Sequence, residues 1–416
     1  MNRIERHLMV WAALVTSLSG CSVPYDCTSF GVTCADNAVC DPDSHRCVCR
    51  EDAEDCRCTR HDQCASGVCD VYAPGASPSA GRTGSCIAAS RIVYVNNQPL
   101  ESCASPDGSR QCALSSLEGG IVTAISKADS ASPIYVRIHG STAPYAAPDW
   151  GKLSIASGKD CVATRKKVVL MGPLGDPSEP PVGVRGDWKL NPDKLPVGLA
   201  LVLDGITLEN AGIKCSGQES KSGEQCLQLS IRRSQLQQVG ATIESTGCFL
   251  SIDGALFDGG YRPVITQVDA GFEITNTIFH NNAAPVTGGA FELMKLSVQA
   301  NKRVFQFNTI NNSMLSEAGG IQCAQDGPKL ADSLIVPASV AGNCTATVNG
   351  NEKKSAVADS TDIHWSTNGT YQIGAGSPLI DQAAESAPLY KWDFYGNPRP
   401  SGAGSDIGAV EYVPQQ

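Results

Sequence analysis

Two aspartates and one arginine have the residue types and the spacing that could act on a polymer. Asp204 and Asp253 hold the same position in two copies of a repeated segment, and Arg232 occurs in the copy between them. Paired carboxylates hydrolyse glycosidic bonds. An arginine beside carboxylates that bind calcium could instead remove a proton in an elimination. Asp204, Asp253 and Arg232 are therefore the candidate catalytic residues. No cofactor is expected apart from calcium, which such an elimination would need.

The two aspartates also have a structural interpretation. Each is followed by glycine, and Asp-Gly is common where a chain turns. This pattern favours a role at corners of the fold over a role in catalysis.

A second group of charged residues lies near the C-terminus. It could be a metal or acid–base cluster, or it could tie the end of the fold together through turns and ion pairs, and the second interpretation is favoured. Its members are Asp381, Asp393, Arg399, Asp406 and Glu411.

The elements that would position these residues repeat along the chain. Each copy has a short apolar strand, a polar corner and a second short strand, usually followed by Asn or Gly. The first four copies start 28, 21 and 22 residues apart. Such periods are typical of solenoids, in which each turn buries its apolar face against its neighbours. The copies are 202–210, 230–238, 251–259 and 273–281, with looser ones at 305–312 and 331–336.

This strand-corner-strand unit resembles that of right-handed parallel β-helix proteins, over roughly residues 91–412. Asn and Gly suit the left-handed backbone conformation of such corners. A leucine-rich repeat, the competing solenoid, would need an LxxLxLxxN frame that the sequence lacks. The predicted fold is all-β, a pectate-lyase-like parallel β-helix over residues 91–370. A helix predicted at 113–128 would cover the open end before the first coil.

The end of the chain resembles the choice-of-anchor Q region that closes many bacterial β-helix proteins. The motifs are GSPLID from Gly376, DFYGNPRP from Asp393 and DIGAVEY from Asp406. The resemblance implies that residues 371–416 close the solenoid and that the protein lies at a cell surface. It implies no reaction, and the signatures of pectate lyases and polygalacturonases are absent from the sequence.

Residues 1–20 are predicted to be an export signal. The uncharged apolar run from Leu8 to Leu18 has 11 residues, which is too short for a bilayer span of about 20 residues. It ends in Leu-Ser-Gly-Cys, which resembles the lipobox of bacterial lipoproteins. The resemblance implies cleavage before Cys21 and lipid on its sulfur. Cys21 is therefore the predicted lipidation site and membrane contact. Two or more acyl chains on it would hold the protein firmly in the membrane.

The residue after Cys21 bears on location. Ser22 stands at this position, and in the best-studied diderm bacteria a residue other than Asp there favours the outer membrane. The expected location is therefore the outer membrane, at the cell surface or facing the periplasm. The alternative is an ordinary cleaved signal with Cys21 in a disulfide.

The cysteine count agrees with lipidation of Cys21. The chain has 19 cysteines, 11 of them in the first 90 residues and eight after; without Cys21 both groups are even. Such density is typical of disulfides in an oxidising compartment, and the CxC pairs do not match zinc spacing. Three predicted pairs are close in sequence and the fourth is left over. They are Cys103–Cys112, Cys215–Cys226, Cys323–Cys344 and, by elimination, Cys161–Cys248.

Residues 21–90 are predicted to form a small disulfide-rich module. They contain almost no apolar run, and small domains of this kind depend on disulfides. The cysteine spacing from Cys34 to Cys49 resembles an EGF-like module. The spacing from Cys58 to Cys86 resembles cysteine-rich repeats of secreted myxobacterial proteins and, distantly, the Dickkopf N-terminal module. A spacer or protein-contact role is expected.

Charge and motifs narrow the function. The net charge of −10 argues against nucleic acid as a partner, because a binding face would be basic. The leading hypothesis is a non-catalytic surface lipoprotein whose β-helix binds a glycan, matrix or another protein. The second is a polysaccharide lyase or glycoside hydrolase on the same scaffold. The third is a structural stalk or adhesin, since FHNN from Phe279 and GGAF from Gly288 resemble motifs of chlamydial polymorphic membrane adhesins.

Overall fold

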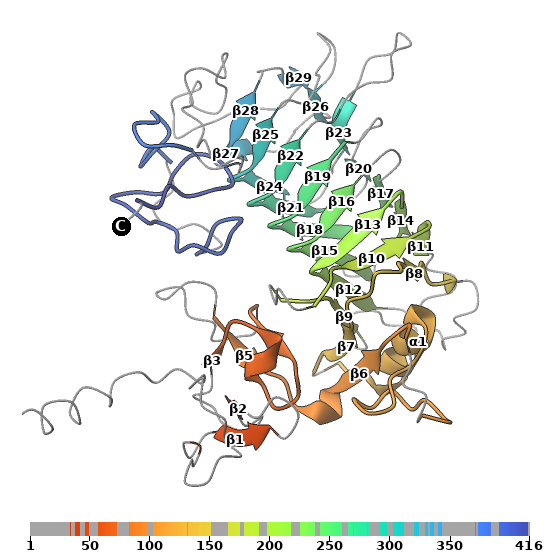
Figure 1. The fold of residues 1–416 in the computed structure, drawn as a ribbon. Coiled ribbons are helices and arrows are strands. Elements are labelled where there is room, and N and C mark those ends of the chain that lie inside the picture. Colours follow the sequence, from red (N-terminus) through yellow and green to blue (C-terminus); the bar gives the residue numbers. More distant parts are fainter. Residues whose placement is uncertain are drawn as a thin grey trace, which may run out of the picture. The chain divides into compact units, whose positions relative to one another are not determined.

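A computed structural model shows how the chain is organised. It divides into two compact units, one built mainly from residues up to Ser90 and the other mainly from Arg91 onward. Each is described by itself (Figure 1). The structure describes residues 34, 38–41, 46–49, 57–72, 83–98, 103–130, 132–150, 165–174, 179–190, 198–217, 225–237, 242–259, 265–268, 270–280, 282, 292–297, 303–311, 320–323, 329–331, 333–336, 340–342, 371, 373–383 and 391–414. The predicted signal and Cys21 lie outside these residues.

The first unit is held by disulfides around small antiparallel sheets. Its disulfides include Cys34–Cys47, Cys58–Cys69 and Cys64–Cys86. The sulfurs of Cys58, Cys64 and Cys69 lie close enough together to resemble a metal site, but all three are in disulfides. The strands are β1 (Ala38–Asp41), β2 (Arg46–Cys49), β3 (Arg57–Cys58), β4 (Cys69–Asp70) and β5 (Gly84–Cys86), with 3-10 helices η1 (His61–Gln63) and η2 (Ala89–Arg91).

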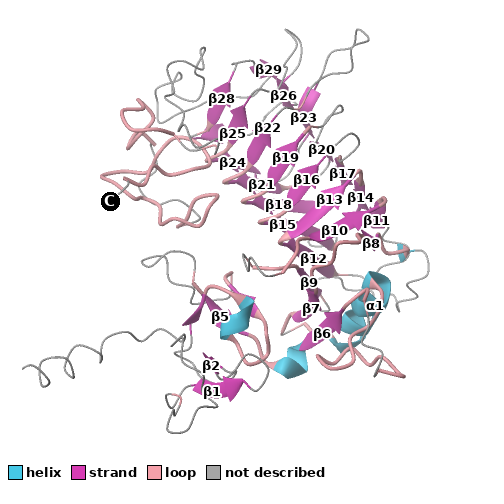
Figure 2. Ribbon diagram, viewed as in Figure 1, coloured by secondary structure: helices cyan, strands magenta, loops and turns pink. Residues whose placement is uncertain are grey.

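The second unit is a parallel β-helix, as the repeats predict. Successive strands pass from sheet I to sheet II to sheet III, and each then pairs in parallel with its counterpart in the next coil. Figure 2 shows the stacked strands. Sheet I contains β6 (Ile92–Val95), β7 (Ile134–Ile138), β9 (Lys166–Met171), β12 (Leu199–Asp204), β15 (Leu227–Arg232), β18 (Phe249–Asp253), β21 (Phe272–Thr275), β24 (Arg303–Gln306) and β27 (Lys329–Ala331).

The other two sheets complete each coil. Sheet II contains β8 (Tyr145–Ala146), β10 (Val182–Arg185), β13 (Ile206–Glu209), β16 (Gln235–Gln237), β19 (Leu256–Asp258), β22 (Ile278–His280), β25 (Thr309–Asn311) and β28 (Leu334–Val336). Sheet III contains β11 (Trp188–Leu190), β14 (Ile213–Ser216), β17 (Ile243–Thr246), β20 (Ile265–Val268), β23 (Glu292–Ser297), β26 (Gly320–Cys323) and β29 (Val340–Gly342).

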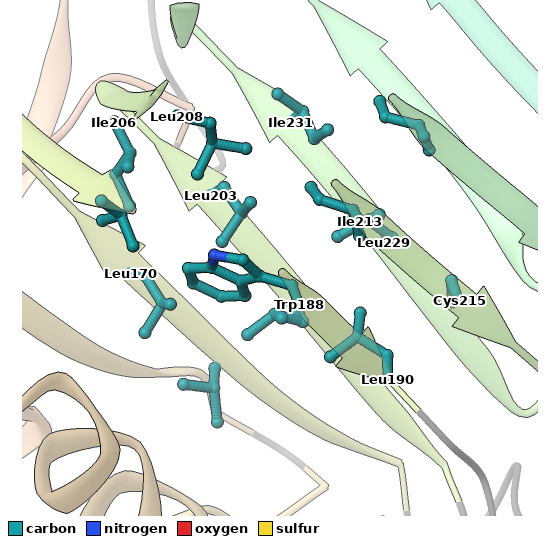
Figure 3. Close-up of a cluster of buried hydrophobic side chains, with 14 of the residues drawn as sticks. Leu170, Trp188, Leu190, Leu203, Ile206, Leu208, Ile213, Cys215, Leu229 and Ile231 are labelled. Atoms are coloured by element: carbon teal, nitrogen blue, oxygen red, sulfur yellow. The ribbon is translucent and has the colours of Figure 1, made fainter. Parts of the chain in front are cut away.

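The core fills the space enclosed by the three sheets. Strand alternation sends every second side chain inward; in β14, for example, Ile213 and Cys215 are buried and the residues between and after them are exposed. Trp188 is fully buried among aliphatic side chains of the neighbouring sheets (Figure 3). Farther along, the rings of Phe257 and Phe279 stack at 4.9 Å between centroids. Each coil thus depends on its neighbours for burial of its apolar residues.

A column of left-handed residues turns the chain from sheet I into sheet II. The φ angles are +69° at Gly205 and +65° at Gly254, and +47° at both Arg233 and Asn276. Glycine and asparagine adopt this conformation at low cost, as the sequence predicts, whereas arginine does so rarely. Something must hold Arg233 in place, and its contacts are described below.

The predicted N-terminal helix is present as α1 (Leu117–Lys127). Ser116 caps it by accepting a hydrogen bond from the Gly119 backbone, as serine commonly does before a helix. Leu117, Ile121 and Ile125 are buried, and the helix packs against β6, β7 and β9. It therefore covers core residues of the first coils (Figure 1).

The disulfides of the second unit correct part of the predicted pairing. Cys103 bonds to Cys112, as expected, but Cys215 bonds to Cys248, so the predicted pairs Cys215–Cys226 and Cys161–Cys248 are wrong. Cys226 is also disulfide-bonded. Cys344 of the fourth predicted pair, with Cys323, lies outside the described residues.

The physical reason for the correction is alternation. Cys215 shares its face of β14 with Ile213, so its sulfur points into the core, where Cys248 is also fully buried. The bond joins one coil to the next from inside. Closeness in sequence favoured a loop clip instead.

Candidate functional site

The predicted catalytic residues are brought together where three neighbouring strands of sheet I end. Asp204 of β12 pairs in register with Arg232 of β15, and Arg232 pairs with Asp253 of β18. The three residues therefore form one column across successive coils. The repeat alignment predicted this shared position correctly.

Within this column, Asp204 lies between two arginine side chains. Asp204 is fully buried, and its Oδ1 accepts a hydrogen bond from Arg233 Nε at 2.7 Å. Its Oδ2 lies 3.9 Å from Arg232 Nη2. Two guanidinium groups thus hold one carboxylate, and this contact restrains Arg233 in its left-handed conformation. Arg233 was not among the candidates, although its place at a corner where other copies have Gly or Asn marks it as unusual.

Asp253 is occupied in a similar way. It is 2% exposed, and its Oδ1 accepts hydrogen bonds from Thr275 Oγ1 at 3.1 Å and from Asn276 Nδ2 at 2.9 Å. These donors belong to the next coil, so the aspartate ties two coils together. Because both aspartates are buried and already hydrogen-bonded, neither presents a carboxylate to a polymer. The two guanidiniums beside Asp204 would also repel a calcium ion, so the residues do not fit that cofactor.

The C-terminal charged group is also internal. The side chains of Arg399 and Glu411 have no exposed surface, and Arg399 Nη1 donates to Glu411 Oε1 at 2.6 Å. Arg399 also donates to the carbonyls of Asp406 and Gly408. Burial raises the pKa of Glu411 to about 7, against the opposing effect of Arg399, and burial lowers the pKa of Arg399. This pair forms the centre of the C-terminal segment, a name used below for the described residues between 371 and 414.

The remaining aspartates of this group bind backbone amides. Asp406 accepts from the N–H of Asp381 at 2.7 Å, and Asp381 accepts from the N–H of Gly404 at 2.8 Å. Asp393 accepts from the N–H of Asn397 and of Glu411. The group therefore organises turns and ion pairs, the interpretation that the sequence favoured.

The C-terminal segment is fastened to the β-helix at the corner between sheets I and II. The guanidinium of Arg399 lies 4.2 Å from the ring centroid of Phe307, and the N–H of Ala409 donates to Thr309 Oγ1 at 2.9 Å. Ala409 and Val410 pack against Ile278 of β22. The segment thereby covers part of sheet II.

A polar ladder runs along the part of sheet II that the segment leaves accessible. The last residue of each strand from β10 to β22 belongs to it, and these residues pair in register from coil to coil. All are exposed or half-buried. We call this set the sheet II ladder; its members are Arg185, Glu209, Gln237, Asp258 and His280. The repeat contains the signal for this set, because the eighth position of its four copies holds Glu209, Gln237, Asp258 and His280.

Aromatic residues stand at the far end of the sheet II ladder. The rings of His280 and Tyr371 meet edge to face at 4.9 Å. Burial, followed by the charge of Asp258, raises the pKa of Tyr371 to about 12. Tyr395 is 43% exposed, and its hydroxyl lies near the backbone of Tyr371. We call Asp258, His280, Tyr371 and Tyr395 the tyrosine patch.

A separate polar cluster lies after β7. Glu179 accepts from the N–H of Gly140 at 2.8 Å and forms an ion pair with Arg137. Its other neighbour is His139, with Nδ1 at 3.7 Å. Burial, followed by the charge of Arg137, lowers the pKa of His139, so this imidazole is neutral at pH 7. The backbone contact and the buried arginine indicate that Glu179 mainly secures the chain after β7.

Comparisons with known proteins add little to this geometry. No family model matches the sequence, and no curated protein matches it. Among solved structures, the crystal structure of pectate lyase Pel9A is similar over 77% of this chain and 96% of that chain, with a TM-score of 0.30 and 11% sequence identity. No helix in the described part of the chain is long and apolar enough to cross a bilayer. The second unit is identified as a parallel β-helix by the parallel, in-register pairing of the strands within each of its three sheets.

Proposed function

We propose that this protein is an exported lipoprotein, anchored to the outer membrane by lipid on Cys21. Its β-helix presents the sheet II ladder to a glycan, to matrix or to another protein, and it binds without catalysis. The N-terminal module separates the anchor from the β-helix along the chain.

One contrast supports a binding role. The residues with the best catalytic spacing, Asp204 and Asp253, are buried and hydrogen-bonded within the fold. In the same coils, the sheet II ladder has hydrogen-bond donors and acceptors that reach the surface. Parallel coils repeat about every 4.8 Å, so the ladder offers a polar group at regular intervals, and an extended partner could contact several of them. Binding needs only such a surface, whereas hydrolysis or elimination needs accessible acid and base groups.

The anchor is tested with the full-length chain expressed in a diderm bacterium. Cells are fed a clickable palmitate analogue, and the protein is fractionated with and without Cys21→Ser. We expect label on the wild type and its retention in carbonate-washed outer membranes, with both lost in Cys21→Ser. Ser22→Ala serves as the control and keeps the label. An unlabelled wild type that is released as a soluble protein would refute the lipid anchor.

Binding and catalysis are tested with the purified mature chain carrying Cys21→Ser. It is applied to panels of glycans, matrix proteins and surface proteins, and the same glycans are assayed for new reducing ends and unsaturated products. We expect saturable binding to at least one partner and no turnover. Turnover of any glycan would replace the binding proposal with an enzymatic one, and no binding to any panel would favour a structural stalk.

A further inference from the structure

We propose that the tyrosine patch is a subsite for an uncharged sugar residue of a glycan chain. This inference rests on the proposed binding role and specifies where the ligand lies and what its chemistry is. The patch combines two tyrosines with a carboxylate and an imidazole, all from the second unit.

The aromatic part of the patch is fixed in place by packing. Tyr371 packs against the apolar cluster of Ile278, Ala409 and Val410 and contacts the ring of His280. Tyr395 is held at right angles to the ring of Phe394, with centroids 5.0 Å apart, yet 43% of it remains exposed. Prepositioned rings lose little conformational entropy on binding.

The polar part of the patch belongs to the sheet II ladder. Asp258 and His280 pair in register on β19 and β22, and Gln237 precedes them on β16. A carboxylate accepts hydrogen bonds, and an imidazole both donates and accepts. Hydroxyl groups, which also do both, are matched by this set. Binding sites commonly combine an aromatic surface with a few polar groups that fix orientation.

These features suit a sugar ring better than a peptide. A pyranose has apolar C–H faces, which can lie on a tyrosine ring, and a rim of hydroxyls, which can reach Asp258 and His280. A peptide that binds by strand addition needs an unpaired strand edge. β19 and β22 are each paired on both sides, so they offer none.

Charge selects an uncharged glycan over an acidic one. Asp258 is the carboxyl group of the patch, and the chain carries a net charge of −10. Two guanidinium groups of the second unit are engaged by carboxylates: Arg185 by Glu209 at 2.9 Å and Arg399 by Glu411 at 2.6 Å. An acidic polymer such as a polyuronate would therefore meet repulsion from the carboxyl group of Asp258 and from the net charge of the chain.

The test measures binding of the mature chain to immobilised neutral, amino-sugar and uronic-acid polysaccharides. We expect binding to a neutral polysaccharide and none to polyuronates. Tyr395→Ala should raise the dissociation constant at least tenfold, and Asp258→Asn should raise it about fivefold. Tyr395→Phe should retain most of the affinity because it keeps the ring. Glu244→Gln, the same chemical change on exposed sheet III, is the matched control and should bind as the wild type does.

Each failure has a different meaning. Neutral-glycan binding that Tyr395→Ala and Asp258→Asn leave unchanged would overturn the patch and keep the binding function. Binding to matrix or protein but to no glycan would do the same. Preferential binding to polyuronates would overturn the selection by charge. Thermal denaturation of Tyr395→Ala checks its fold, and Tyr395→Phe with Asp258→Asn keeps the test valid if that variant is unstable.

Discussion

Arg399 and Glu411 form an ion pair in which neither side chain has any exposed surface. The carboxylate also accepts hydrogen bonds from the N–H groups of Ser401 and Asp406. Since Arg399 lies over the ring of Phe307, this pair couples the C-terminal segment to the β-helix. Its protonation therefore affects how firmly the segment is held.

Stability of the second unit should fall as pH rises through neutrality. Burial raises the pKa of Glu411 to about 7 and also raises the pKa of Asp406. A group whose pKa is higher in the folded than in the unfolded state adds stability that is complete below the unfolded value and is lost as pH rises through the folded value. We expect the free energy of unfolding to be lower at pH 8 than at pH 5. Denaturant titrations at both pH values measure it.

Glu411→Gln isolates the contribution of this carboxyl group. The variant should differ least from the wild type at pH 5, where Glu411 is largely protonated and glutamine is its neutral counterpart. Its stability should change less between pH 5 and pH 8. An unchanged pH dependence would assign the effect to other groups.

Asp204→Ala should destabilise the protein by about 3–5 kcal/mol, since it leaves guanidinium groups without their buried partner. Chemical denaturation measures the change. The control is Glu244→Ala, which removes an ion pair with Lys214. The side chain of Glu244 is 48% exposed and that of Lys214 is 55% exposed, so the loss should be about 0–1 kcal/mol. If Asp204→Ala were neutral for stability but abolished turnover of a glycan, Asp204 would be catalytic after all.

The Cys215–Cys248 disulfide should be visible by peptide mapping of the non-reduced protein. Replacing both residues with alanine should lower stability by about 2–5 kcal/mol, because the bond joins neighbouring coils within the core. The control is the double replacement of Cys103 and Cys112, whose bond spans only 9 residues and should cost less. Recovery of a Cys215–Cys226 peptide would contradict the structure.

Phe279→Ala should cost about 3–5 kcal/mol, typical of a large side chain removed from a core. Phe279 lies between the rings of Phe257, at 4.9 Å, and Phe305, at 6.5 Å, so the cavity would affect three successive coils. Phe279→Leu should cost less because it refills part of the space. Equal losses for both variants would indicate that the ring stack itself, rather than the volume, carries the stability.

The repeats made the solenoid predictable, because the strand-corner-strand period is a local property of the chain. Alternation within β14 also indicates that Cys215 points inward, whereas the closeness of Cys226 in sequence favours a different pair. The capping helix was found from its apolar spacing, and it begins at Leu117, four residues later than residue 113. Its start follows Ser116, which supplies the cap.

The candidate site was predicted in part. The shared position of Asp204, Arg232 and Asp253 follows from the repeat and was correct, yet their burial did not follow from it. The repeat relates Asp258 to His280, but Tyr371 lies more than 100 positions after Asp258, and no repeat relates those two residues. Their proximity depends on where the C-terminal segment packs.

The sequence by itself determined which residues share a column, since strand pairing between equal repeats aligns equal positions. Only the tertiary structure decided in which columns the side chains are buried and in which they are accessible to solvent. Asp204 and Asp258 both stand at the ends of strands, but Arg232 and Arg233 enclose the first, while the second remains half-buried beside Tyr371. The reason is that accessibility depends on side chains and segments from elsewhere in the fold, whose contacts no local pattern records.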